Sequence, residues 1–253
     1  MRSPGAVHGS TLHRPCGAWR VRTANALLGF WLGLACLVPD FARAITDGQV
    51  DTFQDGTTQS WVDALTGAIS PNPPTVVANA GPMGAGDFAL RLTANGSVAG
   101  PGGRLVVNNV QPRWQGSYTV AGIHGILVDV RNPNTYAVTL RVGIDGPTLG
   151  TTGGRWVSPG IVVPATSGWR MLAFSLLPQD LLPGDAAATS AATTLANVGV
   201  FRIMHAPTVT WQGAVVTGQL SLNDVEALPE PGLGLALFAG AWLLGSYGSR
   251  RRR

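Results

Sequence analysis

Short apolar segments with an alternating pattern run through residues 45–228 and restrict the fold more than any other feature. Each is rich in Val, Leu, Ile, Thr or aromatic residues and is bounded by Gly, Pro, Asn or Asp, which is typical of β-strands separated by turns. The segments are Phe88–Thr93, Arg104–Val110, Ile126–Arg131, Ala137–Ile144, Trp156–Val163, Trp169–Leu176, Val198–Met204 and Gln219–Ala227. Most gaps between them are too short for the helical crossovers of a parallel sheet. The sequence therefore predicts an all-β fold, an antiparallel β-sandwich of the jelly-roll type.

One stretch of this body departs from the pattern. Leu177–Ala196 begins with a proline-containing segment and continues through an Ala/Thr-rich tract. The tract has room for one or two helical turns, but its threonines and Gly184 favour an exposed loop. The whole region 45–228 is long enough for one domain with a substantial core.

The N-terminus has the order of a secretory signal. Arginines precede an apolar stretch at Ala24–Val38, and the tripeptide 42–44 supplies the small residues that a signal peptidase reads. We therefore expect a signal helix within a signal peptide over residues 1–44, cleaved after Ala44. The alternative is a lipoprotein anchor at Cys36, which Gly33 disfavours because an aliphatic residue is wanted at that position.

The C-terminus, residues 229–253, has three parts. Pro229, Glu230 and Pro231 precede an uncharged apolar run, Gly232–Gly248. At about 1.5 Å per residue, such a run just reaches across the ~30 Å hydrocarbon layer as a transmembrane helix. The chain then ends in a basic cluster that resists crossing and stays on the cytoplasmic side. The members of the cluster are Arg250, Arg251, Arg252 and Arg253.

This three-part tail resembles the PEP-CTERM sorting signal of bacterial envelope proteins. The resemblance implies recognition of Pro229, Glu230 and Pro231 by an exosortase, a membrane-embedded cysteine protease, with the terminal arginines as the stop-transfer element. It also implies export in a Gram-negative bacterium. The protein would be anchored in the inner membrane before processing and would then reach the cell surface or extracellular matrix. The alternative is a plain C-terminal membrane anchor, which needs no Pro-Glu-Pro motif.

The basic character of the chain belongs to its ends. The sequence pI is about 9.8, but the region 45–228 holds eight arginines against eleven carboxylates, a net charge near −3. A nucleic-acid partner is therefore not predicted. Cys16 and Cys36 are the two cysteines of the chain, and both lie in the signal peptide, so the body has no disulfide.

Three stretches of the body resemble the galactose-binding-like β-sandwich of carbohydrate-binding modules. They are Asp51–Gly56 leading to Trp61, Ser167–Trp169 leading into Ala173–Leu176, and Leu222–Val225. The resemblance implies the same sandwich fold. It does not define a ligand, because one fold serves many functions.

The body shows no catalytic constellation. Its histidines, His124 and His205, are far apart in the sequence, and no Gly-x-Ser-x-Gly motif occurs. Glycoside hydrolysis needs two carboxylates flanking a cleft, and no spacing shows that Asp63, Asp129 or Asp180 pair. We therefore expect a non-catalytic surface or matrix protein with extracellular polysaccharide as its candidate partner. The alternatives are an envelope glycan hydrolase and a purely structural surface protein.

Aromatic residues in polar, glycine-bearing stretches are the candidate sugar-binding residues, because sugar C–H faces stack on aromatic rings. Trp114 and Tyr118 lie in such a stretch, and Trp211 lies in another. The competing interpretation is that each ring belongs to the core, where aromatic residues usually lie.

No cofactor is expected, with a structural calcium ion as the one alternative. Calcium prefers hard oxygen ligands, and aspartates gather near the two ends of the body. If the terminal strands pair, as in sandwiches of this kind, Asp47, Asp51 and Asp224 are the candidate ligands. The competing interpretation is that these are solvated carboxylates at strand edges.

Overall fold

A computed structural model describes residues 44–65, 67–147, 154–185 and 189–229. The predicted signal helix, the apolar tail span, Glu230, Pro231 and the terminal arginines lie outside these ranges. Within them, no helix is both long enough and apolar enough to cross a membrane.

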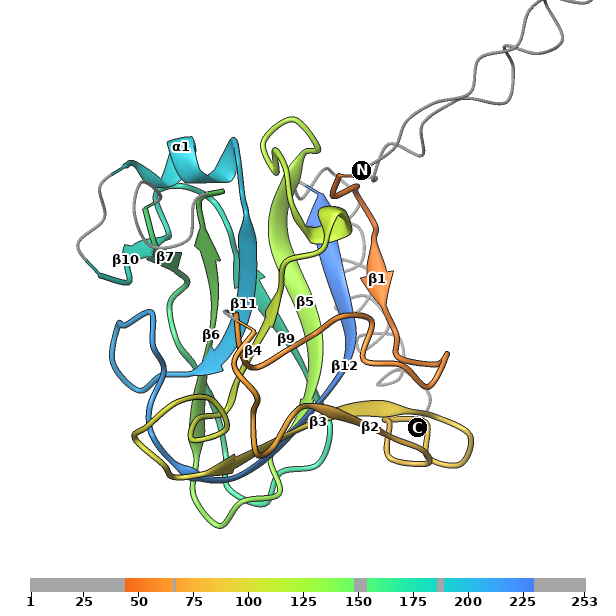
Figure 1. Ribbon diagram of the computed structural model, residues 1–253. Helices are drawn as coiled ribbons and strands as arrows, with labels where there is room; N and C mark the ends of the chain where they lie inside the picture. The colour runs from red at the N-terminus through yellow and green to blue at the C-terminus, as the bar shows by residue number, and fades with distance from the viewer. Residues whose placement is uncertain (1–43, 66, 148–153, 186–188, 230–253) are drawn as a thin grey trace, which may run out of the picture. The chain divides into compact units, whose positions relative to one another are not determined.

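Two antiparallel sheets make up the described body (Figure 1). Sheet A contains β1 (Val50–Asp51), β2 (Thr75–Val77), β3 (Ala89–Asn95), β5 (Ile123–Arg131), β9 (Arg170–Ser175) and β12 (Thr217–Pro229). Sheet B contains β4 (Val106–Asn109), β6 (Val138–Asp145), β7 (Trp156–Val157), β8 (Ile161–Val163), β10 (Leu182–Pro183) and β11 (Val200–His205). The predicted all-β antiparallel sandwich is confirmed.

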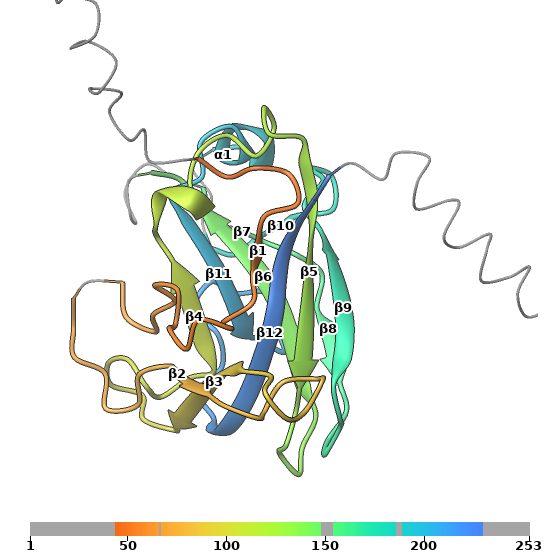
Figure 2. The same cartoon turned by 90° about the vertical axis from the view of Figure 1, so that its right-hand side faces the viewer.

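Sheet A is organised around its longest strand, β12. Its strand order is β2-β3-β12-β5-β9, and β1 also pairs with β12. Thr217–Leu222 pair with β3, whereas Val225 and Glu226 pair with β1 once β3 has ended (Figure 2). A bulge after Asn223 separates these two parts, and Asp224 within it has a positive φ of 43°. The first and last strands of the body therefore pair.

Sheet B has the order β10-β7-β6-β11-β4, with β8 also paired to β6. The sequence predicts one strand over Trp156–Val163, whereas the structure has two short strands, β7 and β8, separated at Ser158–Gly160. Pro159 lies in the gap and has no backbone N–H to donate to a ladder, so the strand is interrupted there.

Alternating side chains from the two sheets meet in one main core. In β11, Phe201 and Ile203 face this core, whereas Val200 and Met204 belong to a second, smaller cluster. Successive strand residues point to opposite faces, so the second cluster lies on the outer face of sheet B. Its buried members are Val106, Val157, Val200, Met204, Ala206 and Trp211.

The predicted exposed loop over Leu177–Ala196 is wrong in part. It contains the short strand β10 and a five-residue helix, α1 (Ala191–Leu195). The Ser190 hydroxyl caps this helix by accepting from the backbone N–H of Thr193 at 3.2 Å. Ala191 and Leu195 pack into the main core, and this burial stabilises a helix whose intrinsic propensity is weak.

Candidate functional site

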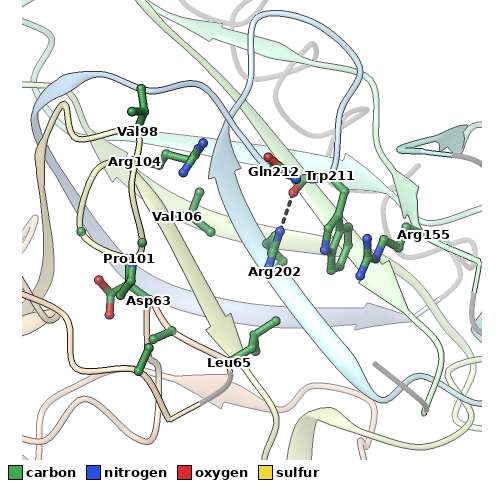
Figure 3. Close-up of a pocket in the computed structure, with 14 residues that line it drawn as sticks. Asp63, Leu65, Val98, Pro101, Arg104, Val106, Arg155, Arg202, Trp211 and Gln212 are labelled. Carbon is green, nitrogen blue, oxygen red and sulfur yellow. Dashed lines mark hydrogen bonds between the residues drawn. The ribbon is translucent and has the colours of Figure 1, made fainter. Parts of the chain in front are cut away.

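A pocket of about 490 Å³ opens on the outer face of sheet B (Figure 3). Four loop segments and the strands β4 and β11 line it. The lining residues are Asp63, Ala64, Leu65, Ala68, Val98, Gly100, Pro101, Gly102, Arg104, Val106, Arg155, Arg202, Trp211 and Gln212. Apolar side chains and guanidinium groups therefore share one concave surface.

Arg202 is directed into this pocket by the strand itself. Its neighbours Phe201 and Ile203 face the main core, so Arg202 points to the outer face, where it is only 8% exposed. Its Nε donates to Asn108 Oδ1 at 2.6 Å, and its Nη1 donates to the carbonyl of Trp211. Burial, with a further contribution from Arg155, lowers the pKa of Arg202 to about 9. The guanidinium is nevertheless mostly protonated at neutral pH.

Trp211 lies between two arginines in the wall of the pocket (Figure 3). The guanidinium carbon of Arg202 is 4.0 Å from the centroid of the Trp211 ring, and that of Arg155 is 5.5 Å away. The indole also packs on Gly143, where a Cβ would come within 2.9 Å of Cζ3. The ring is 4% exposed. Trp211 thus lies at the candidate site, as a support for Arg202 with little free surface for a sugar.

The charges around the pocket are unevenly balanced. Arg155 pairs with Asp145 at 3.1 Å and with Asp185 at 2.7 Å. Arg104 and Arg202 take part in no ion pair among the described residues, and Arg104 Nε is buried without a hydrogen-bond partner there. Asp63 also lines the pocket and accepts a hydrogen bond from the Ser70 hydroxyl.

The predicted binding roles of Trp114 and Tyr118 are wrong, because neither side chain is exposed. The 3-10 helix η2 (Pro112–Trp114) turns Trp114 into the core, where its ring stacks on Phe201 with centroids 4.9 Å apart. The Tyr118 hydroxyl donates to the Trp114 carbonyl at 3.0 Å. The polar residues around Trp114 are typical of an exposed loop, and for this reason the sequence predicts an exposed ring.

Asp51, a predicted calcium ligand, is instead the acceptor for buried indoles. Its Oδ2 accepts from Nε1 of Trp61 and of Trp114, both at 2.7 Å, and Arg113 forms an ion pair with its other oxygen. Burial raises the pKa of Asp51, while the bonds from Trp114 and Trp61 oppose this effect. A buried indole N–H needs an acceptor, and Asp51 serves two.

The structure does not join the other predicted metal ligands to Asp51. Asp47 is exposed, and Asp224 lies in the bulge of β12. The described part of the chain contains no group of three or more His, Cys, Asp or Glu side chains suited to a metal ion. The predicted calcium ligand set of Asp47, Asp51 and Asp224 is therefore not supported.

Carboxylates do approach one another on sheet A. Burial raises the pKa of Asp129, and the charge of Asp87 adds to this effect. Burial also raises the pKa of Asp224, with further contributions from Asp129 and Asp87. These carboxylates lie away from the pocket on sheet B, whose lining includes Asp63 as its one carboxylate among the described residues.

The buried histidine has a structural role. Nδ1 of His205 accepts a hydrogen bond from the backbone N–H of Thr139 at 3.0 Å. Burial lowers the pKa of His205, so the neutral ring that this bond requires is favoured. No serine is hydrogen-bonded to this ring in the described structure.

No protein-family profile and no curated protein matches the chain. Among solved structures, a family 11 carbohydrate-binding module from Clostridium thermocellum, in complex with a β-1,3-1,4-mixed-linked tetrasaccharide, is 16% identical. The match covers 74% of this chain and 97% of that one, with a TM-score of 0.47. The CBM22-2 xylan-binding domain from Paenibacillus barcinonensis is 10% identical over 72% of this chain and 98% of its own, with a TM-score of 0.45.

An exo-β-agarase gives a TM-score of 0.50 at 9% identity. The match covers 74% of this chain but only 26% of the agarase chain, so the likeness concerns one part of a larger protein. At this identity the comparison bears on the fold alone, and it agrees with the sandwich described above.

Proposed function

We propose that the body is a non-catalytic polysaccharide-binding domain of an exported cell-envelope protein. The observation that carries the proposal is the pocket on sheet B, where apolar side chains lie beside guanidinium donors. Sugars present both apolar C–H faces and hydroxyl groups, and binding sites for small polar ligands combine these same two kinds of surface. A glycan ligand is also in keeping with the fold shared with part of an exo-β-agarase.

The apolar side of the pocket extends onto an exposed rim. Leu65, Pro101 and Val106 contribute to its wall, and Val98 lines it while remaining 79% exposed. Ile69, next to the lining residue Ala68, is also strongly exposed. Apolar side chains gathered at a concave surface are typical of binding sites.

The carboxylates favour binding over hydrolysis. A glycosidase of the usual kind needs two carboxyl groups flanking the scissile bond, whereas Asp63 is the one carboxylate in the described lining. Asp145 and Asp185 are engaged by Arg155. We therefore assign binding without turnover to this pocket.

Exposed valines provide a matched test of glycan binding. The full-length protein, purified in detergent, is applied to an array of neutral and acidic polysaccharides. Val98→Glu places a charge on the pocket rim and is expected to lower glycan affinity by about tenfold. Val120→Glu makes the same change at an exposed site outside the lining and is expected to have no effect. Equal losses in both variants, or no glycan signal for the wild-type protein, would contradict the proposal.

The tail supports the proposed route to the envelope. An exosortase-type protease is expected to recognise Pro229, Glu230 and Pro231 after residues 1–44 have directed export. Prolines keep such a motif extended and outside the following helix. Replacing all three residues by alanine should block processing in the native host, as measured by cell fractionation and mass spectrometry of the mature protein. Normal processing of that variant would leave the tail as a plain membrane anchor.

A further inference from the structure

We propose that the pocket on sheet B binds the carboxylate groups of an acidic polysaccharide, which specifies the ligand class for the polysaccharide-binding function proposed above. The inference rests on the charge balance, the free donors and the rigidity of the arginines in the lining.

The charge balance of the pocket favours an anion. The body as a whole is acidic, yet Arg104 and Arg202 converge on this one concavity without an ion-pair partner among the described residues. Arg155 does not add to this excess, because Asp145 and Asp185 neutralise it. Asp63 lies across the pocket from Arg155 (Figure 3). A ligand with a negative group placed beside Arg104 and Arg202 would supply the missing counter-charge.

The two arginines also have donors to offer. A guanidinium carries five N–H groups in a planar fork that matches a carboxylate. Arg202 uses Nε and Nη1 for Asn108 and Trp211, and no described hydrogen bond involves its Nη2. The buried Nε of Arg104 has no partner in the described structure. A carboxylate that enters the pocket can accept from guanidinium donors of Arg104 and Arg202 that no described hydrogen bond uses.

Arg202 is held in place before any ligand arrives. Asn108 fixes one edge of its guanidinium, and the guanidinium carbon lies 4.0 Å from the centroid of the Trp211 ring. Trp211 is itself fixed, because its backbone N–H donates to the Gly184 carbonyl at 2.8 Å and its ring packs on Gly143. A preorganised donor loses little conformational entropy on binding. This arrangement suits recognition of a planar anion better than general attraction of negative charge.

Polygalacturonate and its methyl-esterified form provide a matched pair of probes, because they share a backbone and differ in the charge of the carboxyl group. Binding to the full-length protein in detergent is measured by titration calorimetry at about 0.1 M salt. Polygalacturonate is expected to bind at least about tenfold more tightly than the ester. Arg104→Gln should remove most of this preference, and a thermal melt checks that the variant is folded. Arg170→Gln, an equal charge change at an exposed position of β9 in sheet A, should leave it unchanged.

The outcomes separate this inference from the underlying function. Equal binding of the acid and the ester, unaffected by Arg104→Gln, would overturn the acidic-ligand inference and leave polysaccharide binding standing. Equal losses from Arg104→Gln and Arg170→Gln would show a general charge effect and would also overturn the inference. Absence of binding to either probe and to every glycan of the array would overturn the proposed function itself.

Discussion

A tryptophan side chain contacts a buried charged group at two places in this protein. The two places differ in whether the charged group has an ion-pair partner within the protein. In the core, Asp51 accepts from Trp61 and Trp114 and is paired with Arg113. On the outer face of sheet B, Arg202 lies against Trp211 beside an open pocket, with no ion-pair partner among the described residues. The first arrangement can only stabilise the fold. In the second arrangement, Arg202 lines an open pocket and keeps its Nη2 outside every described hydrogen bond.

The largest effect is expected when the closed arrangement is broken. Asp51→Ala leaves two buried indole N–H groups and the Arg113 guanidinium without their acceptor, and should lower the free energy of unfolding by about 3–5 kcal/mol. Chemical denaturation measures this loss. Asp47→Ala is the control, because Asp47 is exposed and its removal should change stability by less than about 0.5 kcal/mol. Similar stabilities for both variants would show that Asp51 is not the centre of the buried network.

Paired tryptophan variants sharpen the comparison. Trp114→Phe removes one donor to Asp51, and Trp211→Phe weakens the contact with Arg202; each should cost about 1–3 kcal/mol of stability. Only Trp211→Phe should also weaken polysaccharide binding, because only Trp211 holds an arginine of the pocket. Chemical denaturation measures the stability of the two variants, and glycan titration measures their affinity for polysaccharide. A loss of binding in Trp114→Phe would mean that the two regions are coupled.

The smallest expected effect is a loss of folding stability at acidic pH. The loop that carries Trp211 is joined to His205 by a backbone hydrogen bond, in which the Ala214 N–H donates to the His205 carbonyl at 2.8 Å. Because burial lowers the pKa of His205, the folded state binds fewer protons than the unfolded state below the ordinary pKa of about 6.5. Its contribution to stability is therefore complete above that pH and is lost as the pH falls toward the lowered pKa.

The His205→Gln variant isolates this contribution. Unfolding free energies of wild type and variant are compared at pH 7.5 and pH 5.5. The wild type should lose more stability than the variant on acidification, and the carboxylates common to both proteins cancel in the difference. An identical pH dependence in the two proteins would contradict a role for His205.

Local patterns predicted the strands well, and long-range partners explain what they missed. Alternation placed most strands within a few residues, but β1 and β10 contain two residues each and are too short to show a period. Trp114 was misplaced because its acceptor, Asp51, lies 63 residues earlier in the chain. Arg202 had a usable signal, since it falls between Phe201 and Ile203 in an apolar strand. The pocket itself had no sequence signal, because the residues that line it come from segments far apart in the sequence.

The position of β12 has a consequence for how the protein is made. This strand is the last of the described body, yet β1, β3 and β5 all pair with it. A growing chain therefore holds three strands of sheet A before their common partner has been synthesised. Pairings between distant segments form late because loop closure must come first. The complete sheet A can therefore form only after residues 217–229 are available, because β12 is the strand that joins β1, β3 and β5.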